Sequence, residues 1–365
     1  MSYPKFDEKE LEVVGEIPSR SGGQATPVLS YPIPKVDAII AAFNRKPVWQ
    51  VGTSGPEAGL FVPSIIPDNI ARAFWFDATT SPDVEKIGGK DMFGIEWEYV
   101  PVVGGSIVKP GNPTLSSASE LETKVVWPDI DSWDWDAFVE LNKDYMGRDV
   151  AYNTQILNGF FERLISFMDF EEAAIAMIDE EDKEYVKAFF DKLSDLYIKL
   201  IDKHIELWPQ IIVYTIHDDW GSQNSTFFAP EIVAEVIVPY MKKVTDFIHS
   251  KGKFADLHSC GKITKQIPNI IAAGWDSWTP QITSDVPEIY EAYGEQLIIG
   301  TLPAPSREYT DSEEDQKAKA QEYVAAYCKP DKTSNFSAYG MFDPAITQTF
   351  LKEVYKQSRL AYQQD

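Results

Sequence analysis

Strand-like and helix-like hydrophobic patterns alternate along most of the chain. The clearest helix is predicted over 181–208, where Val186, Leu193 and Leu200 lie on one apolar stripe at the helical period. Further helices are predicted over 36–44, 66–76, 160–168, 230–250, 267–273, 287–293, 313–328 and 345–362. Short apolar runs predict strands over 48–51, 94–100, 151–157, 210–216, 254–257, 275–278, 297–300 and 335–339.

This alternation predicts an α/β fold. Strands that alternate with helices at this spacing form parallel βαβ units, and about eight units fit a (β/α)8 TIM barrel. An open doubly wound sheet is the alternative, but no G-x-G-x-x-G motif follows the first predicted strand. We expect residues 36–365 to form a single barrel domain. Residues 1–35, acidic and then rich in Ser, Gly and Pro, are expected to be an N-terminal arm or cap.

The composition argues against some classes of binding partner. The net charge of −24 argues against nucleic acids and anionic membranes, both of which need a basic surface. No apolar run is long enough to predict a membrane span, and Met1–Glu10 has no signal-peptide pattern. Two cysteines do not form a secreted disulfide framework, so a cytoplasmic location is expected. The aromatic share of 13% allows a large core and a ring-lined pocket.

The strand predicted over 254–257 ends in a candidate metal site. His258 and Cys260 are separated by one residue, in a chain with only four histidines and two cysteines. In extended backbone, residues i and i+2 point to the same side. An imidazole and a thiolate directed at one point suit zinc. The alternative is a buried thiol beside a hydrogen-bonded histidine.

Other strand ends carry further candidates, because active residues of a barrel lie at the carboxyl ends of its strands. His217, Asp218 and Asp219 follow one strand; the acids either cap a helix and anchor the loop, or belong to the site. Alternation directs the two adjacent acids to opposite sides, so at most one should face the barrel axis. Glu96 belongs to another predicted strand end. Five residues near strand ends are candidates for a substrate pocket: Trp49, Trp220, Gln223, Trp278 and Tyr339.

Four stretches resemble the uroporphyrinogen decarboxylase superfamily: 45–49, the loop 218–223, the helix with Pro239 and Tyr240, and above all 257–261 with its H-x-C motif. The resemblance extends from about residue 36 to the C-terminus and implies a (β/α)8 barrel. The decarboxylase branch has an arginine-rich segment after the first strand, whereas 50–55 contain no arginine here, so decarboxylation is rejected. The zinc- and corrinoid-dependent methyltransferase branch has H-x-C followed by a second cysteine.

The resemblance implies a zinc site with His258 and Cys260 as ligands. The expected second cysteine is absent after Gly340, so Cys328 is the candidate third ligand. A carboxylate from Glu96, Asp218 or Asp219 is the alternative ligand, and the same three carboxyls are candidate catalytic proton donors.

The implied function is that of the methyltransferase component of an anaerobic O-demethylase. A methyl group would pass from a small-molecule O-methyl donor, expected to be a methoxylated aromatic, to the Co(I) corrinoid (cobalamin) of a partner corrinoid protein. Two alternatives stay open: transfer of methyl from a corrinoid to a thiol of the coenzyme M type, and a metal-free binding protein. A homodimer is a further expectation.

Overall fold

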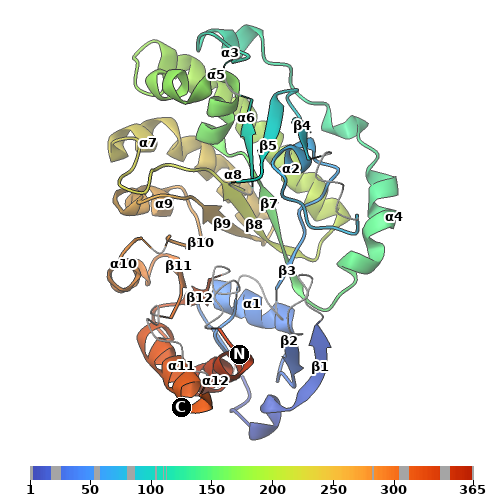
Figure 1. Ribbon diagram of the computed structural model, residues 1–365, viewed down its shortest axis with the longest axis vertical. Coiled ribbons are helices and arrows are strands. Elements are labelled where there is room, and N and C mark those ends of the chain that lie inside the picture. Colours follow the sequence, from blue (N-terminus) through green and yellow to red (C-terminus); the bar gives the residue numbers. More distant parts are fainter. Residues whose placement is uncertain are drawn as a thin grey trace. The chain divides into compact units, whose positions relative to one another are not determined.

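The computed structural model describes residues 3–17, 26–52, 58–79, 87–102, 105–109, 111, 113–281, 283–303, 312–337 and 346–363. The chain forms two compact units. Unit 1 comprises 1–59, 149–153 and 276–365, and unit 2 comprises 60–148 and 154–275. Figure 1 labels the elements of both.

Unit 2 holds two of the parallel strands, a three-stranded antiparallel sheet and most of the long helices. Its strands are β4 (Gly88–Lys90), β5 (Glu96–Val100), β6 (Gly105–Val108), β8 (Ile211–His217) and β9 (Phe254–His258). Its helices are α2 (Pro67–Ala71), α3 (Glu120–Thr123), α4 (Trp135–Met146), α5 (Phe160–Ala176), α6 (Asp182–Leu207), α7 (Pro230–Val236), α8 (Val238–Ser250) and α9 (Ile267–Ala272). Strand β7 (Ala151–Ile156) has residues in both units.

Unit 1 contains the two ends of the chain. Its strands are β1 (Val13–Ile17), β2 (Thr26–Leu29), β10 (Ser277–Trp278), β11 (Ile298–Thr301) and β12 (Ser334–Phe336), and β3 (Ala58–Leu60) begins in it. Its helices are α1 (Lys35–Phe43), α10 (Val286–Tyr293), α11 (Glu313–Tyr327) and α12 (Gln348–Ala361). Near the N-terminus, Glu10 accepts hydrogen bonds from Arg359 Nε at 2.8 Å and Tyr355 Oη at 2.7 Å, which attach this segment to α12.

The main sheet has seven strands in the order β12-β11-β10-β9-β8-β7-β3. The pairs β8–β9, β10–β11 and β11–β12 are parallel. Helices follow most of these strands in the sequence, because each apolar strand is succeeded by an amphipathic segment whose apolar stripe can cover the sheet. A curled parallel sheet that alternates with helices is typical of the (β/α)8 class, so the predicted fold class is confirmed. The division into an arm and a single barrel domain stays a prediction.

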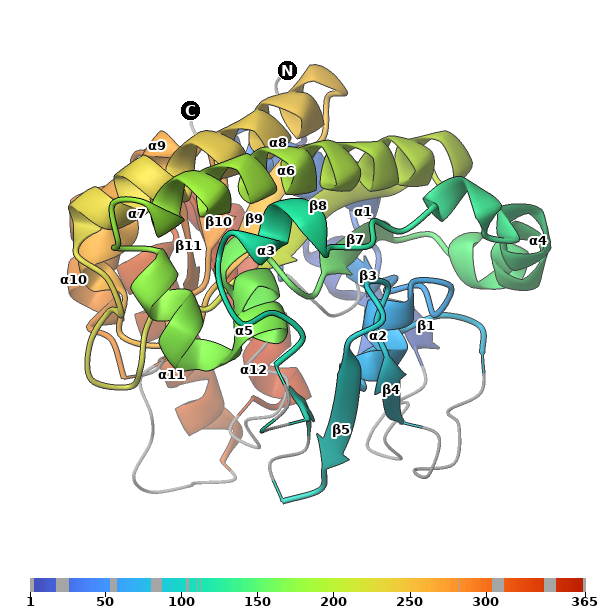
Figure 2. The same cartoon turned by 90° about the horizontal axis from the view of Figure 1, so that it is seen from above.

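The long helices of unit 2 pack side by side. Figure 2 shows α6 and α8 running next to each other. Ser194 Oγ of α6 donates to the carbonyl of Tyr240 in α8 at 3.3 Å, and Lys243 of α8 pairs with Asp191 of α6 at 2.8 Å. Among the described residues, no helix is long and apolar enough to cross a membrane.

Three predicted elements differ from the structure. Residues 48–51 form no strand of their own, although Val51 accepts a hydrogen bond from Phe336 N at 2.9 Å and Gly52 bridges to β12. The helix predicted over 66–76 is limited to α2. The helix predicted over 230–250 is two helices, because Pro239 has no N–H to continue the first one and lies at the start of α8.

Candidate functional site

Two histidines end neighbouring parallel strands in the same register. His217 is the last residue of β8 and His258 the last of β9, and the two are paired Cα partners. Paired residues of adjacent strands project to the same face of a sheet. Their rings are therefore stacked, with centroids 4.6 Å apart and an interplanar angle of 23°. The sheet register thus brings together two imidazoles that are distant in the sequence.

Two further donors join these histidines from the loops that follow the strands. His217, Asp219, His258 and Cys260 each offer one ligand atom, and these four atoms lie within 4.8 Å of one another. His258 Nε2 is 3.5 Å from Cys260 Sγ, and His217 Nε2 is 3.6 Å from an Asp219 carboxylate oxygen. All four side chains are half-buried, so the cluster can be reached from solvent.

Two of the spacings between these atoms match those of a tetrahedral zinc site. Zinc binds imidazole nitrogen and carboxylate oxygen at about 2.0–2.2 Å and thiolate sulfur at about 2.3 Å. At tetrahedral angles these bond lengths separate a nitrogen from a sulfur by about 3.5 Å, and a nitrogen from an oxygen by about 3.4 Å. The observed 3.5 and 3.6 Å are close to both values. The donor set therefore fits zinc, with two ligands from each strand end.

The two loops that carry these donors are joined by backbone hydrogen bonds. The N–H of Cys260 donates to the Asp219 carboxylate at 2.6 Å, and the N–H of Lys262 donates to the Ser222 carbonyl at 2.8 Å. Gly261 lies between these contacts with a φ of +89°, and a Cβ there would be 2.3 Å from the Gly221 carbonyl oxygen. Only glycine allows the loops to approach this closely.

A carboxylate and a guanidinium lie behind His217. Glu162, in the first turn of α5, is 2.7 Å from His217 Nδ1, and Arg72, which follows α2, donates to Glu162 at 3.0 Å. Burial disfavours both charges of the Glu162–His217 pair, but mutual attraction outweighs it. The pKa of Glu162 is accordingly lowered to about 2 and that of His217 raised to about 10. His258 differs: burial, with repulsion from His217, lowers its pKa to about 3.

Asp218 has a capping role, one of the two alternatives left open by the sequence. It is fully buried and accepts hydrogen bonds from the backbone N–H of Glu162 at 2.9 Å and of Phe161 at 3.3 Å, at the start of α5. Trp220 Nε1 donates to it at 2.8 Å. Burial raises the pKa of Asp218 to about 7 although these donors favour its charged form. As strand alternation predicts, only Asp219 of the adjacent pair joins the donor cluster.

Cys328 does not belong to the group of four donors. It is buried in unit 1, where its thiol donates to Gln50 Oε1 at 3.3 Å, and burial raises its pKa to about 12. Glu96 begins β5, an antiparallel strand rather than a barrel strand, and its side chain is exposed. Periodicity alone does not separate such a strand from a parallel one. Ligand or catalytic roles for these two residues stay predictions.

The aromatic candidates are part of the core. Trp49, Trp220 and Trp278 are completely buried. Trp49 stacks on Tyr31 with ring centroids 5.1 Å apart. Gln223 is exposed in the loop after β8, and Tyr339 lies outside the described residues. A substrate role for any of these candidates stays a prediction.

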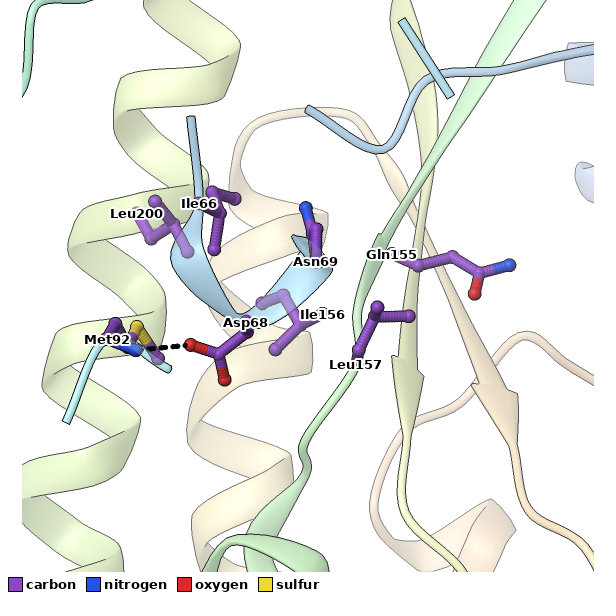
Figure 3. A pocket seen from close by; sticks show the side chains of 8 residues that line it. All are labelled: Ile66, Asp68, Asn69, Met92, Gln155, Ile156, Leu157 and Leu200. Carbon is purple, nitrogen blue, oxygen red and sulfur yellow. Dashed lines mark hydrogen bonds between the residues drawn. The ribbon is translucent and has the colours of Figure 1, made fainter. Parts of the chain in front are cut away.

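A buried ionic cluster lies elsewhere in unit 2. Arg163 of α5 pairs with Asp68 of α2, and with Asp91 at 2.6 Å, and all three side chains are buried. Figure 3 shows Asp68 beside a small hollow, its carboxylate accepting the N–H of Met92 at 3.0 Å. The hollow is lined by Ile66, Asp68, Asn69, Met92, Gln155, Ile156, Leu157 and Leu200. It has room for only about one water molecule.

Comparison with known proteins supports the sequence resemblance. A family model described as uroporphyrinogen decarboxylase (URO-D) matches residues 162–335, a stretch that contains Glu162 and all four donors. The predicted resemblance to the uroporphyrinogen decarboxylase superfamily is confirmed. No curated protein gives a significant match.

A solved structure shares the fold. A methyltransferase from Methanosarcina mazei is 15% identical, with a TM-score of 0.56, and the match covers 91% of this chain and 100% of that one. At this identity the match shows a common fold. An endo-β-1,4-mannanase from Thermotoga petrophila gives 10% identity and a TM-score of 0.34 over 67% of this chain and 68% of that one. That second match is too weak to support any argument.

Proposed function

We propose that the chain is a zinc-dependent methyltransferase of the uroporphyrinogen decarboxylase superfamily. It would transfer a methyl group from a methoxylated aromatic compound to the Co(I) corrinoid of a partner protein. The observation that carries the proposal is the cluster of His217, Asp219, His258 and Cys260, half-buried where β8 and β9 end. The fold shared with a Methanosarcina mazei methyltransferase supports the reaction class.

The four donors would hold the zinc ion, which would have to release one of them or take a fifth ligand for a substrate oxygen to bind. When bound, zinc would supply a Lewis acid for the ether oxygen, whose phenolate is a poor leaving group. Of the three carboxyls considered as ligands or acids, only Asp219 lies among the metal donors, and we assign it the ligand role. Asp218 instead fixes the start of α5, which carries Glu162 behind His217.

The reaction balances without a further reactant. The bond between the methyl carbon and the ether oxygen breaks, and its electron pair stays on the phenolate. The methyl carbon forms a new bond to cobalt, and the Co(I) state supplies that electron pair. The phenolate then takes a proton from solvent, so the products are a phenol and a methylated corrinoid.

The test combines metal analysis with a methyl-transfer assay. The zinc-loaded chain is mixed with cobalamin reduced to Co(I) and a methoxybenzoate, and the phenol product is measured by mass spectrometry. We expect about one zinc per chain and phenol formation, and loss of both in His258→Ala and Cys260→Ser. Cys328→Ser is the matched control, since it makes the same exchange at the chain's other thiol and should keep both.

Other outcomes would redirect the assignment. A wild-type chain without zinc after expression in zinc-supplemented medium would refute the proposal. Bound zinc without phenol formation, together with methyl transfer from methylcobalamin to a thiol, would replace it with the thiol methyltransferase alternative. Equal zinc content in His258→Ala and the wild type would show that these donors do not hold the metal.

A further inference from the structure

The feature that carries a further inference is the chain of contacts behind His217. One ring nitrogen, Nε2, lies on the side of Asp219, and the other, Nδ1, lies 2.7 Å from Glu162 Oε2. A carboxylate accepts hydrogen bonds, so Nδ1 carries the proton in this contact. A metal ion bound to this ring would replace the proton on Nε2, the nitrogen directed at the donor cluster.

Glu162 is itself fixed from two directions. Its backbone N–H donates to Asp218 at 2.9 Å, so the first turn of α5 is held against the end of β8. Its carboxylate accepts from Arg72 Nη1 at 3.0 Å. The Glu162 side chain therefore has little freedom to turn away from His217.

Arg72 is positioned by contacts of its own. The same Nη1 donates to Asn158 Oδ1 at 2.9 Å, and the guanidinium lies over the Trp97 ring at 5.2 Å from the centroid. The side chains of Arg72 and Glu162 are 19% and 13% exposed, so water only partly screens their interaction. Arg72 thus contacts Glu162, and its Nη2 also lies 3.3 Å from His217 Nδ1, so both residues lie behind the donor cluster.

We propose that Glu162 is a positioning residue for the metal site, and that Arg72, which contacts both Glu162 and His217, supports it. Glu162 holds His217 with Nδ1 protonated and Nε2 facing the metal, and Arg72 holds the Glu162 carboxylate in place. A carboxylate that accepts from a ligating histidine fixes its ring and increases its basicity. This inference rests on the proposed zinc site, but it concerns residues that do not bind the metal.

The experiment measures zinc affinity directly, by competition with a chromophoric chelator, in the full chain. Removal of such a partner typically costs about 10–100-fold in metal affinity. We expect a loss of that size in Glu162→Gln, which keeps the shape of the side chain but removes its charge. Arg72→Met should lose less.

Glu235→Gln is the matched control. Glu235 is an exposed carboxylate on α7 that pairs with Lys187 at 2.6 Å, so the variant makes the same exchange at a surface ion pair. It should bind zinc as the wild type does. Cobalt(II) substitution gives a second readout, since a displaced His217 should alter the ligand-field absorption of bound cobalt in Glu162→Gln and leave the Glu235→Gln spectrum unchanged.

The outcomes separate this inference from the proposed function. If the wild type binds no zinc, the metal site fails and this inference fails with it. If the wild type binds zinc and Glu162→Gln matches it in affinity and cobalt spectrum, only the positioning role is overturned. If Glu162→Gln does not fold, as judged by circular dichroism, Arg72→Met decides: wild-type affinity in that variant overturns the role.

Discussion

Gly261 offers a direct test of how the loops after β8 and β9 form the site. Its φ of +89° is unfavourable for any residue with a Cβ. A Cβ would also lie 2.3 Å from the Gly221 carbonyl oxygen, 2.4 Å from its carbonyl carbon and 2.8 Å from the Ser222 carbonyl oxygen. All three atoms are backbone, so no side chain can turn aside to relieve the overlap. In Gly261→Ala the two loops must therefore move apart.

The expected cost has two parts. The left-handed conformation costs about 1–2 kcal/mol for a residue with a Cβ. Overpacking of a tightly packed site typically costs about 1–3 kcal/mol more. Gly261→Ala should therefore reduce the free energy of unfolding by about 2–5 kcal/mol. Because Gly261 follows Cys260, which bonds to Asp219, separation of the loops should also weaken zinc binding.

The control variant Gly94→Ala separates the cost of the backbone conformation from the cost of overpacking. Gly94 has a similar φ of +82° and lies in the same unit, but a Cβ there would have no atom within 4 Å. This control should lose only about 1–2 kcal/mol and keep wild-type zinc affinity. Urea unfolding followed by tryptophan fluorescence gives the stabilities, and chelator competition gives the affinities. The reasoning is refuted if Gly261→Ala is no less stable than Gly94→Ala and binds zinc equally well.

Three further predictions concern other buried groups. Burial lowers the pKa of His204 to about 3, so acid protonates this histidine in the unfolded chain before it does so in the folded chain. The wild type therefore loses stability between pH 7 and 4.5. His204→Phe should reduce that loss, measured by urea unfolding, by about 2–3 kcal/mol. Arg163→Met leaves Asp68 and Asp91 buried without their cation and should cost about 3–5 kcal/mol in the same assay. Cys328→Ser should keep wild-type zinc content by elemental analysis, and loss of the metal would restore Cys328 as a ligand.

The sequence predicts local features of this fold well. The stripe of α6 and the H-x-C pair after β9 depend on spacings within one element, and periodicity reports such spacings directly. Features that depend on more than the apolar pattern of one element are harder to predict from the sequence. The break between α7 and α8 depends on Pro239, whose effect the apolar pattern conceals. The strand that carries Glu96 is antiparallel rather than a barrel strand, and its apolar pattern does not distinguish the two.

His217 shows why the metal cluster could be predicted only in part. The sequence places it at a strand end beside two acids, but its role depends on the pairing of β8 with β9 in a register that aligns it with His258. The register depends on tertiary packing and cannot be predicted from the sequence of either strand alone. One signal was present nevertheless: two of the four histidines each end an apolar strand, and each is followed two residues later by a possible ligand, Asp219 or Cys260.

The set of metal donors bears on the choice between two reactions: methyl transfer from an ether to a corrinoid, and methyl transfer from a corrinoid to a thiol. The family resemblance implies H-x-C and a second cysteine, whereas this cluster has His217 and Asp219 in addition to His258 and Cys260. One thiolate with one carboxylate carries the same charge of about −2 as two thiolates, so neutralisation of Zn²⁺ is preserved. The carboxylate is a harder donor than the thiolate it replaces. A zinc ion with fewer soft ligands has more affinity for oxygen. This set of donors therefore favours an ether oxygen over a thiol as the substrate atom, and it supports the O-methyl donor in the proposed reaction.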